Sequence, residues 1–335
     1  MLQTRRNFFS SVRQRVLDVE SLWLHVNRTA MATRFEVTLP LSAERGVAAA
    51  STALDEIDLL EAQLTAFRET SELSFINRHA GTRAVSVERN FFNLLLLCKE
   101  LSVETDGAFD ITAGPLLKCW GFLKREGRLP VTAEIEASRS RVGSGNLLLD
   151  QRAQTIEFLR NGVEINLGSI GKGYALDRVA SQLRNDVETA FLNAGASSML
   201  AIGNGNRDQG WQIGLRDPRV KKRRVGVFWL SDAALSTSGS QEQFFEHQGS
   251  RFGHIIDPRT GWPASGVASV SVIADTAALS DALATAFFVG GTELAKKYCA
   301  SHDRIMAIMF EPEAIAPIVF GSHPNCKDLR FLLKG

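Results

Sequence analysis

Apolar and polar residues alternate near the start of the chain in the manner of a β-strand. Within residues 29–39, Phe35, Val37 and Leu39 alternate with polar residues, as in a half-buried strand. From about residue 42 to 64, and again from about residue 87 to 105, the apolar spacing is three or four residues, which is typical of one face of a helix. This part of the chain therefore predicts a strand and two helices, with a loop over Phe67–Asn77 between the helices.

The middle of the chain predicts shorter elements. Residues 123–150 are charged and rich in glycine, which is typical of a surface segment. Residues 155–165 alternate on either side of an Asn161-Gly162 pair, and Asn-Gly is the commonest turn of a tight hairpin. The pattern therefore predicts a hairpin with its turn at residues 161 and 162.

The last third predicts strands around a pair of helices. We expect strands at residues 211–217, 225–230, 268–274 and 305–310. We expect the helices at residues 276–289 and 292–301. A basic run at residues 221–224 falls between the first two strands and indicates a solvated hairpin tip. Because strands and helices mix without regular βαβ alternation, we expect an α+β fold in one large mixed domain rather than a doubly wound sheet.

Composition sets the remaining bounds. The chain has 335 residues, 44% of them apolar and 22% charged, with a net charge of +1, as in a soluble globular protein. This balance gives no reason to expect nucleic-acid binding. We expect a polar lead over residues 1–28 and one domain over residues 29–335. Four widely spaced cysteines form no cluster with metal-ligand spacing and fit reduced thiols.

The N-terminus resembles a twin-arginine signal without its apolar core. Arg5 and Arg6 precede two phenylalanines, but charged residues follow where an apolar run would lie. The sequence has no apolar run long enough to span a bilayer. We therefore favour a cytoplasmic location, and the periplasm stays open as the alternative.

Most reactive side chains that lie close together in the sequence fall between His254 and Thr285. His254 supplies a base that titrates near neutrality. Asp281 and Thr285 are four residues apart in a run that favours helix, so their oxygens share one face. A carboxylate, a hydroxyl and carbonyl oxygens suit magnesium, usually together with substrate phosphates. Taken alone, Asp281 could also be a helix cap and His254 a structural residue.

A glycine-rich segment from Asn166 to Asp177 precedes a predicted helix. Backbone N–H groups at a helix start suit a pyrophosphate. The segment is not a P-loop, because Gly173 rather than serine or threonine follows Lys172 and Asn166 takes the place of the first glycine. These features predict phosphate chemistry assisted by a metal ion.

Three motifs together resemble the ApbE family, the FAD:protein FMN transferases. They are the residues from His254 to Thr285, the run from Gly107 to Phe122, and the segment from Asn166 to Asp177. This chain departs from the family pattern at Asn166, where the family has aspartate, at Ser169 and Gly171, and at Ala32, where the family has glycine. The resemblance covers about residues 29–310 and implies an ApbE-like fold related to the T-fold.

The resemblance implies transfer of FMN from FAD to a threonine hydroxyl of an acceptor protein, with magnesium required and AMP released. It implies that His254 is the catalytic base. The implied flavin contacts are Met31, Phe67, Ala108, Phe109, Asp110, Asn166, Lys172 and Ile256. The implied magnesium ligands are the side chains of Asp281 and Thr285 and the carbonyl oxygens of Ser169 and Ala284. Backbone donors near Ala108–Asp110 are expected to meet the edge of the flavin ring.

Three alternatives remain at this level. An FAD pyrophosphatase of the same family would use water in place of threonine. A flavin-binding protein would hold FAD without turnover. The presence of Asn166 where the family has aspartate makes this worth testing. A structural relative would bind no ligand.

Overall fold

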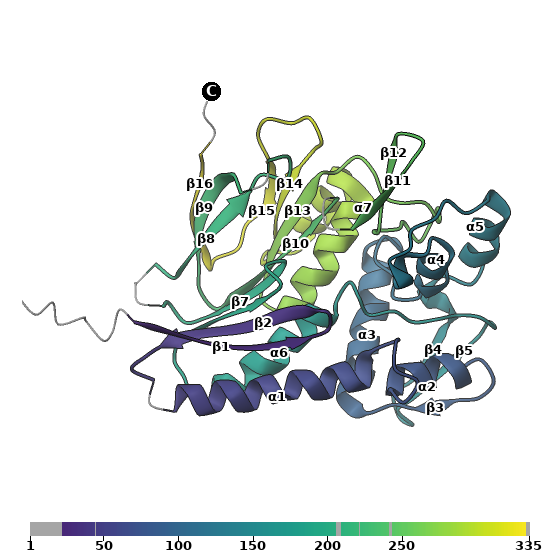
Figure 1. The fold of residues 1–335 in the computed structure, drawn as a ribbon, viewed down its shortest axis with the longest axis horizontal. Coiled ribbons are helices and arrows are strands. Elements are labelled where there is room, and N and C mark those ends of the chain that lie inside the picture. Colours follow the sequence, from purple (N-terminus) through teal and green to yellow (C-terminus); the bar gives the residue numbers. More distant parts are fainter. Residues whose placement is uncertain (1–21, 44, 206–208, 221, 241–242, 333–335) are drawn as a thin grey trace, which may run out of the picture.

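An antiparallel eight-stranded sheet forms the centre of the computed structural model, which describes residues 22–332 apart from 44, 206–208, 221 and 241–242 (Figure 1). In spatial order its strands are β1 (Trp23–Ala30), β2 (Thr33–Pro40), β6 (Ala190–Ala194), β7 (Ser198–Ile202), β10 (Ala233–Gly239), β13 (Ser269–Ala274), β14 (Met306–Phe310) and β15 (Ile318–Gly321). Every neighbouring pair is antiparallel. This confirms the α+β class, because a doubly wound fold requires a mostly parallel sheet.

Three long helices cover one face of this sheet (Figure 1). They are α1 (Gly46–Leu64), α6 (Gly171–Leu183) and α7 (Ala277–Ser301). The other face packs against a three-stranded sheet of β8 (Trp211–Arg216), β9 (Arg224–Leu230) and β16 (Cys326–Phe331). Side chains alternate along β13 accordingly, because Val272 and Ala274 join the helical core while Ile273 joins the second core.

A second group of elements lies on the right of the view in Figure 1. It contains α2 (Glu72–His79), α3 (Arg89–Glu104), α4 (Gly114–Cys119), α5 (Thr132–Arg139), the 3₁₀ turns Phe122–Lys124 and Ser144–Asn146, and a small sheet of β3 (Val85–Ser86), β4 (Leu147–Asp150) and β5 (Thr155–Phe158). The hairpin of β11 (Phe244–His247) and β12 (Ser250–Gly253) packs beside α4 through the buried ring of Trp120.

Several predicted elements are confirmed. The helices expected from residues 42–64 and 87–105 are α1 and α3, and the strand expected at 29–39 is β2. The two C-terminal helices form α7, which is interrupted at Gly291 with φ of +72°. Among the described residues, no helix combines the length and the apolar character needed to cross a bilayer.

Three expectations need correction. The segment expected to be a loop forms α2, which begins where the Ser71 side chain accepts a hydrogen bond from the Ser74 N–H. The hairpin expected around Asn161-Gly162 does not form, because β5 pairs instead with β4 and β3. Finally, residues 23–28 do not belong to the lead, since they form most of β1 and pair with β2. Residues 1–21 lie outside the described part.

Candidate functional site

A cavity of about 480 Å³ lies where the turn between β1 and β2, the glycine-rich segment, the Gly107–Phe122 run and α7 meet. The predicted site residues that line it are Met31, Phe67, Ala108, Asp110, Asn166, Ser169, Lys172, His254, Ile256, Asp281 and Thr285. Segments far apart in the sequence therefore converge on one space. Two predicted residues, Phe109 and Ala284, are fully buried in the core and do not line it.

The start of α7 is capped by residues other than Asp281. The Thr276 hydroxyl accepts a hydrogen bond from the Leu279 N–H. Both carboxylate oxygens of Asp177 accept N–H bonds, from Ala277 at 2.7 Å and from Ala278 at 2.8 Å. The alternative that Asp281 caps this helix is therefore wrong, and its carboxylate points to the cavity from the second turn of α7.

Gly173 brings α6 close enough to α7 for the two helices to share Asp281. A Cβ atom at position 173 would lie 2.1 Å from the Ala277 carbonyl oxygen, so only glycine fits. As a result, the Gly173 N–H donates to Asp281 Oδ2 at 3.1 Å. This approach explains why glycine follows Lys172, the position at which a P-loop would have a hydroxyl residue.

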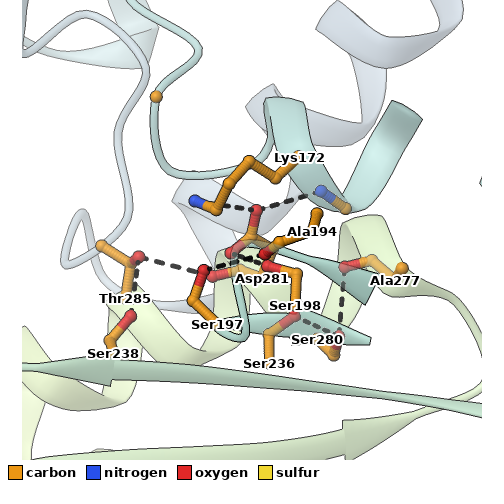
Figure 2. A network of polar contacts seen from close by, with 12 residues as sticks. Lys172, Ala194, Ser197, Ser198, Ser236, Ser238, Ala277, Ser280, Asp281 and Thr285 are labelled. Atoms are coloured by element: carbon orange, nitrogen blue, oxygen red, sulfur yellow. Dashed lines mark hydrogen bonds and ion pairs between the residues drawn. The ribbon is translucent and has the colours of Figure 1, made fainter. Parts of the chain in front are cut away.

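Asp281 is a buried carboxylate with few internal donors (Figure 2). The Ser198 hydroxyl donates to Oδ1 at 3.2 Å, and the Lys172 ammonium lies 3.9 Å from Oδ2. Asp281 as a whole residue is 5% exposed. Burial raises the pKa of Asp281, against the opposing influence of Lys172, the Gly173 N–H and the Ser198 hydroxyl. The site therefore holds a desolvated carboxylate that an added cation would stabilise.

Hydroxyl groups surround the same end of the cavity. Thr285 Oγ1 lies 3.3 Å from Ser238 Oγ and donates to the Asp281 carbonyl at 3.4 Å. Ser197, Thr237 and Ser238 also line the cavity, and the sequence analysis missed all three. Their only sequence signal is the clustering of serine and threonine at the ends of β7 and β10, which become neighbours only in the folded sheet.

The donor set at this end suits a hard cation held together with a phosphate. It offers one carboxylate and several hydroxyl oxygens, which magnesium accepts as ligands. In the described part of the chain, no group of three or more His, Cys, Asp or Glu side chains could hold a metal ion. The oxygens therefore fit magnesium only if other ligands complete its shell. Ala284 does not line the cavity, so the structure gives no support for its carbonyl as one of them.

The glycine-rich segment offers backbone donors next to Asp281. Asn166 Oδ1 accepts the Gly168 N–H at 2.9 Å, and the Gly171 N–H bonds the Leu167 carbonyl at 2.8 Å. Within the described residues, the N–H groups of Ser169 and Lys172 have no protein acceptor. They lie at the N-terminus of α6, where the helix dipole favours an anion. This arrangement can bind phosphate oxygens.

Part of the cavity lining is apolar. Phe67, Met31 and Ala108 belong to this part, and the Phe67 residue is 71% exposed. The expected backbone donors are partly occupied, because the Ala108 N–H bonds the Thr105 carbonyl and the Phe109 N–H bonds the Thr105 hydroxyl. The N–H groups of Ala108 and Phe109 are therefore engaged within the protein, and the flavin-edge contact stays a prediction. An exposed aromatic ring beside an apolar wall still suits a flat ring system.

Asp110 lines the cavity but has its carboxylate engaged within the protein. Oδ1 accepts the Thr112 N–H at 2.8 Å and the Thr112 hydroxyl at 2.5 Å. Oδ2 accepts the Ser102 hydroxyl at 3.1 Å and the Ser144 N–H at 2.7 Å. This carboxylate joins α3, the Gly107–Phe122 run and the turn at residue 144, so its first role is structural.

His254 lies where the β11–β12 hairpin ends, and its ring contacts the backbone. Nδ1 is 3.0 Å from the Gln243 carbonyl oxygen, and the ring meets Phe122 edge-on at 6.5 Å between centroids. A carbonyl only accepts, so Nδ1 carries the proton in this contact and a neutral ring has its lone pair on Nε2. The turn that follows is fixed by Asp257, which accepts the Arg259 N–H at 2.9 Å.

The turn between β1 and β2 stores backbone strain beside the cavity. Met31 has φ of +49° and Ala32 has φ of +57°, as in a two-residue turn that usually contains Asn-Gly. Positive φ costs an ordinary residue about 1–2 kcal/mol. Ala32 therefore adopts a left-handed backbone conformation at a position where the family has glycine.

Comparison with known proteins finds relatives in one family. The model of the ApbE family matches residues 31–310. An FAD:protein FMN transferase of Klebsiella pneumoniae is 34% identical over 257 residues, which cover 76% of this chain and 78% of that protein. One from Vibrio cholerae is 31% identical over 280 residues, which cover 81% of this chain and 82% of that protein.

Solved structures show the same fold. The crystal structure of the ApbE protein from Thermotoga maritima matches with a TM-score of 0.82 and 30% identity, covering 90% of this chain and 97% of that one. The flavin transferase ApbE from Vibrio cholerae matches with a TM-score of 0.78 and 25% identity, over 90% and 97% of the two chains. The matched region contains every residue that lines the cavity.

Proposed function

The chain belongs to the ApbE family, and from this premise we propose that it transfers FMN from FAD to a threonine hydroxyl of an acceptor protein, releasing AMP. The observation that carries the proposal is the convergence of His254, Asp281 and the N–H groups of the glycine-rich segment on one cavity. Group transfer from a pyrophosphate needs a base, charge neutralisation and phosphate donors in one place.

In this proposal FAD spans the cavity from the apolar part of its lining to its hydroxyl-lined end. The flavin lies beside Phe67, Met31 and Ala108, where an exposed aromatic ring can stack on it. Asn166 and Ile256 are proposed to contact the flavin between these two parts. The pyrophosphate lies at the start of α6, within reach of the N–H groups of Ser169 and Lys172.

Magnesium is proposed to bind at the hydroxyl-lined end. Asp281, Thr285 and the Ser169 carbonyl would hold it, together with phosphate oxygens of FAD. When bound, the ion supplies Lewis-acid stabilisation of the charge that develops on the pyrophosphate. The Lys172 ammonium, 3.9 Å from Asp281, adds a second positive charge on the same side.

His254 is proposed as the general base. Its Nδ1 contact with the Gln243 carbonyl fixes the ring and leaves the basic lone pair of a neutral imidazole on Nε2. Nε2 would accept the proton of the threonine hydroxyl as that oxygen attacks the phosphorus of the FMN half. A positioned base of this kind contributes about 10²–10⁴-fold to rate.

The test compares His254→Ala with the matched variant His247→Ala, which removes an exposed histidine from the neighbouring strand. We expect His254→Ala to transfer FMN at least roughly a hundredfold more slowly with FAD affinity nearly unchanged. The measurement is single-turnover labelling, followed by flavin fluorescence of the acceptor in a denaturing gel.

The outcomes separate the related functions. Transfer at the wild-type rate by His254→Ala would show that this side chain is not the base. AMP release without labelling of any acceptor would indicate an FAD pyrophosphatase, and FAD binding without AMP release would indicate a flavin-binding protein.

We propose the cytoplasm as the working compartment, because all four cysteines are free thiols.

A further inference from the structure

A second cavity of about 270 Å³ adjoins the first one at His254. Three residues, Gly239, His254 and Ile255, line both cavities. The remaining lining comes from β12, the segment at residues 264–268, the Pro218-Arg219 pair, and the single residues Ser240, Phe288 and Pro312. The base proposed for the transfer therefore lines two spaces, and the proposed FAD site is the first of them.

The second cavity opens where two backbone segments stop pairing. Ile256 forms an antiparallel bridge with Pro263, and the Ala264 N–H donates to the Ile255 carbonyl at 2.8 Å. Continued pairing would place Gly253 opposite Gly266. Among the described residues no backbone hydrogen bond joins these two, and both line the cavity. The segments separate there and leave a slot between two backbones.

One side of this slot presents backbone polar groups. The His254 N–H bonds the Gln243 carbonyl at 3.0 Å, which makes residues 243 and 254 a hydrogen-bonded pair of the β11–β12 ladder. In an antiparallel ladder the next pair, Phe244 and Gly253, is not hydrogen-bonded. The N–H and C=O of Gly253 therefore point away from β11 and toward the slot. They can pair with one more extended segment.

The slot is also open in volume. A Cβ atom added at Gly253 or Gly266 would meet nothing within 4 Å. Arg219 also lines the slot and is paired with Asp217 at 3.0 Å. The slot therefore has room for the backbone of another segment at these two positions.

We propose that this slot, between Gly253 and Gly266, binds an extended segment of the acceptor protein as an added β-strand and delivers its threonine to His254. The proposal rests on the transfer function argued above. Backbone pairing with Gly253 would fix the register of the segment, so that the threonine next to the pairing position reaches Nε2 while FAD fills the first cavity.

The chemistry balances with these partners alone. The threonine Oγ–H bond breaks and its proton passes to His254 Nε2. A bond forms between Oγ and the phosphorus of the FMN half, and the bond from that phosphorus to the bridging oxygen breaks. AMP leaves with the bridging oxygen and the electron pair, and the proton on Nε2 is released to solvent. The products are the threonyl phosphodiester of FMN, AMP and a proton.

The test fills the slot with a side chain. Gly253→Val adds bulk where the acceptor backbone would lie, and Gly145→Val is the matched control, because position 145 also faces open space and lies outside both cavities. The acceptor is a purified flavin-free domain that an ApbE relative modifies at a threonine. We expect Gly253→Val to lower kcat/KM for this domain at least about tenfold, and FAD affinity to change less than about twofold. Gly145→Val should behave as wild type.

A second measurement does not depend on the variant folding. Hydrogen exchange of the wild-type protein with FAD is followed before and after addition of the acceptor domain with its threonine replaced by alanine. Slower exchange in residues 250–255 and 264–268 is expected. The proposed role of the slot would be overturned if exchange there is unchanged while the intact domain is still labelled. Wild-type transfer by Gly253→Val would overturn it as well. Failure of the wild-type protein to label any acceptor would instead overturn the transfer function.

Discussion

Two buried aspartates line the same cavity and differ in how the protein satisfies them. Asp110 accepts four hydrogen bonds from Ser102, Thr112 and Ser144. Asp281 accepts two, from Gly173 and Ser198, and burial raises its pKa. The protein therefore stabilises the charge of Asp110 by itself, whereas it leaves Asp281 in need of another cation. Counting internal donors separates a structural carboxylate from one reserved for a ligand.

This difference also concerns stability. A carboxylate with a full set of donors contributes to the fold, because its removal leaves buried donors without acceptors. A desolvated carboxylate with few donors costs stability until a ligand compensates, which is common at functional sites. We therefore expect substitutions at the two positions to have opposite effects on folding and unequal effects on transfer.

The largest expected effect is the loss of transfer in Asp281→Asn. The asparagine keeps the shape but removes the charge that would hold magnesium against the pyrophosphate, so AMP release should fall at least about a thousandfold. Chromatographic separation of FAD, FMN and AMP measures it. The control is Asp303→Asn, an exposed carboxylate just after α7. If Asp281→Asn releases AMP at the rate of this control, the metal site does not lie on α7.

The second effect is a loss of stability in Asp110→Asn. The amide nitrogen would face hydroxyl and N–H donors in place of an acceptor, which should lower the free energy of unfolding by about 2–4 kcal/mol. Urea denaturation of this variant beside Asp186→Asn, an exposed carboxylate, gives the difference. If Asp110→Asn is as stable as wild type, the four contacts do not hold the loop together.

The third effect concerns Asn166. The family has an aspartate at this position, as this chain has at Asp110 and Asp281. Its Oδ1 accepts the Gly168 N–H, and aspartate would keep that bond while replacing the amide group with a second acceptor. We expect Asn166→Asp to bind FAD more tightly by about 1.5–3 kcal/mol at most, the range of one charged hydrogen bond. Equal affinities in a fluorescence titration of the two proteins would place Asn166 outside the flavin site.

The smallest effect is a gain in stability for Asp281→Asn without ligand. Because the folded-state pKa of Asp281 is raised, the folded protein binds more protons than the unfolded chain above the unfolded pKa of about 3.9. The carboxylate therefore destabilises the fold as pH rises through that value. At pH 7 the variant should be more stable by about 1 kcal/mol, and the difference should shrink toward pH 4. A variant less stable than wild type at pH 7 would contradict this.

The sequence could predict which motif residues meet at the cavity better than it could predict their surroundings. Short motifs contain His254, Lys172 and Asp281, whose spacing indicates chemistry before any fold is known. The hydroxyls of Ser197, Thr237 and Ser238 were missed because they come together only when β7 and β10 pair. In the same way, no local pattern reveals that Ser144 donates to Asp110 across 34 residues.

The fold shows the same division between local and distant information. Long amphipathic helices such as α1 and α3 were predicted because their periodicity is a property of the segment itself. The hairpin expected at Asn161-Gly162 was wrong because a good turn signal does not determine which strand pairs with β5. The short helix α2 was missed because its eight residues give too brief a pattern.

The proposed role of Asp281 is to hold a cation that binds together with FAD. Calorimetric titration of FAD with and without magnesium tests this most directly, in the wild-type protein and in Asp281→Asn, because it measures binding in the absence of an acceptor. We expect magnesium to tighten FAD binding at least about tenfold in the wild-type protein and less than about twofold in Asp281→Asn. Equal tightening in both proteins would contradict the account.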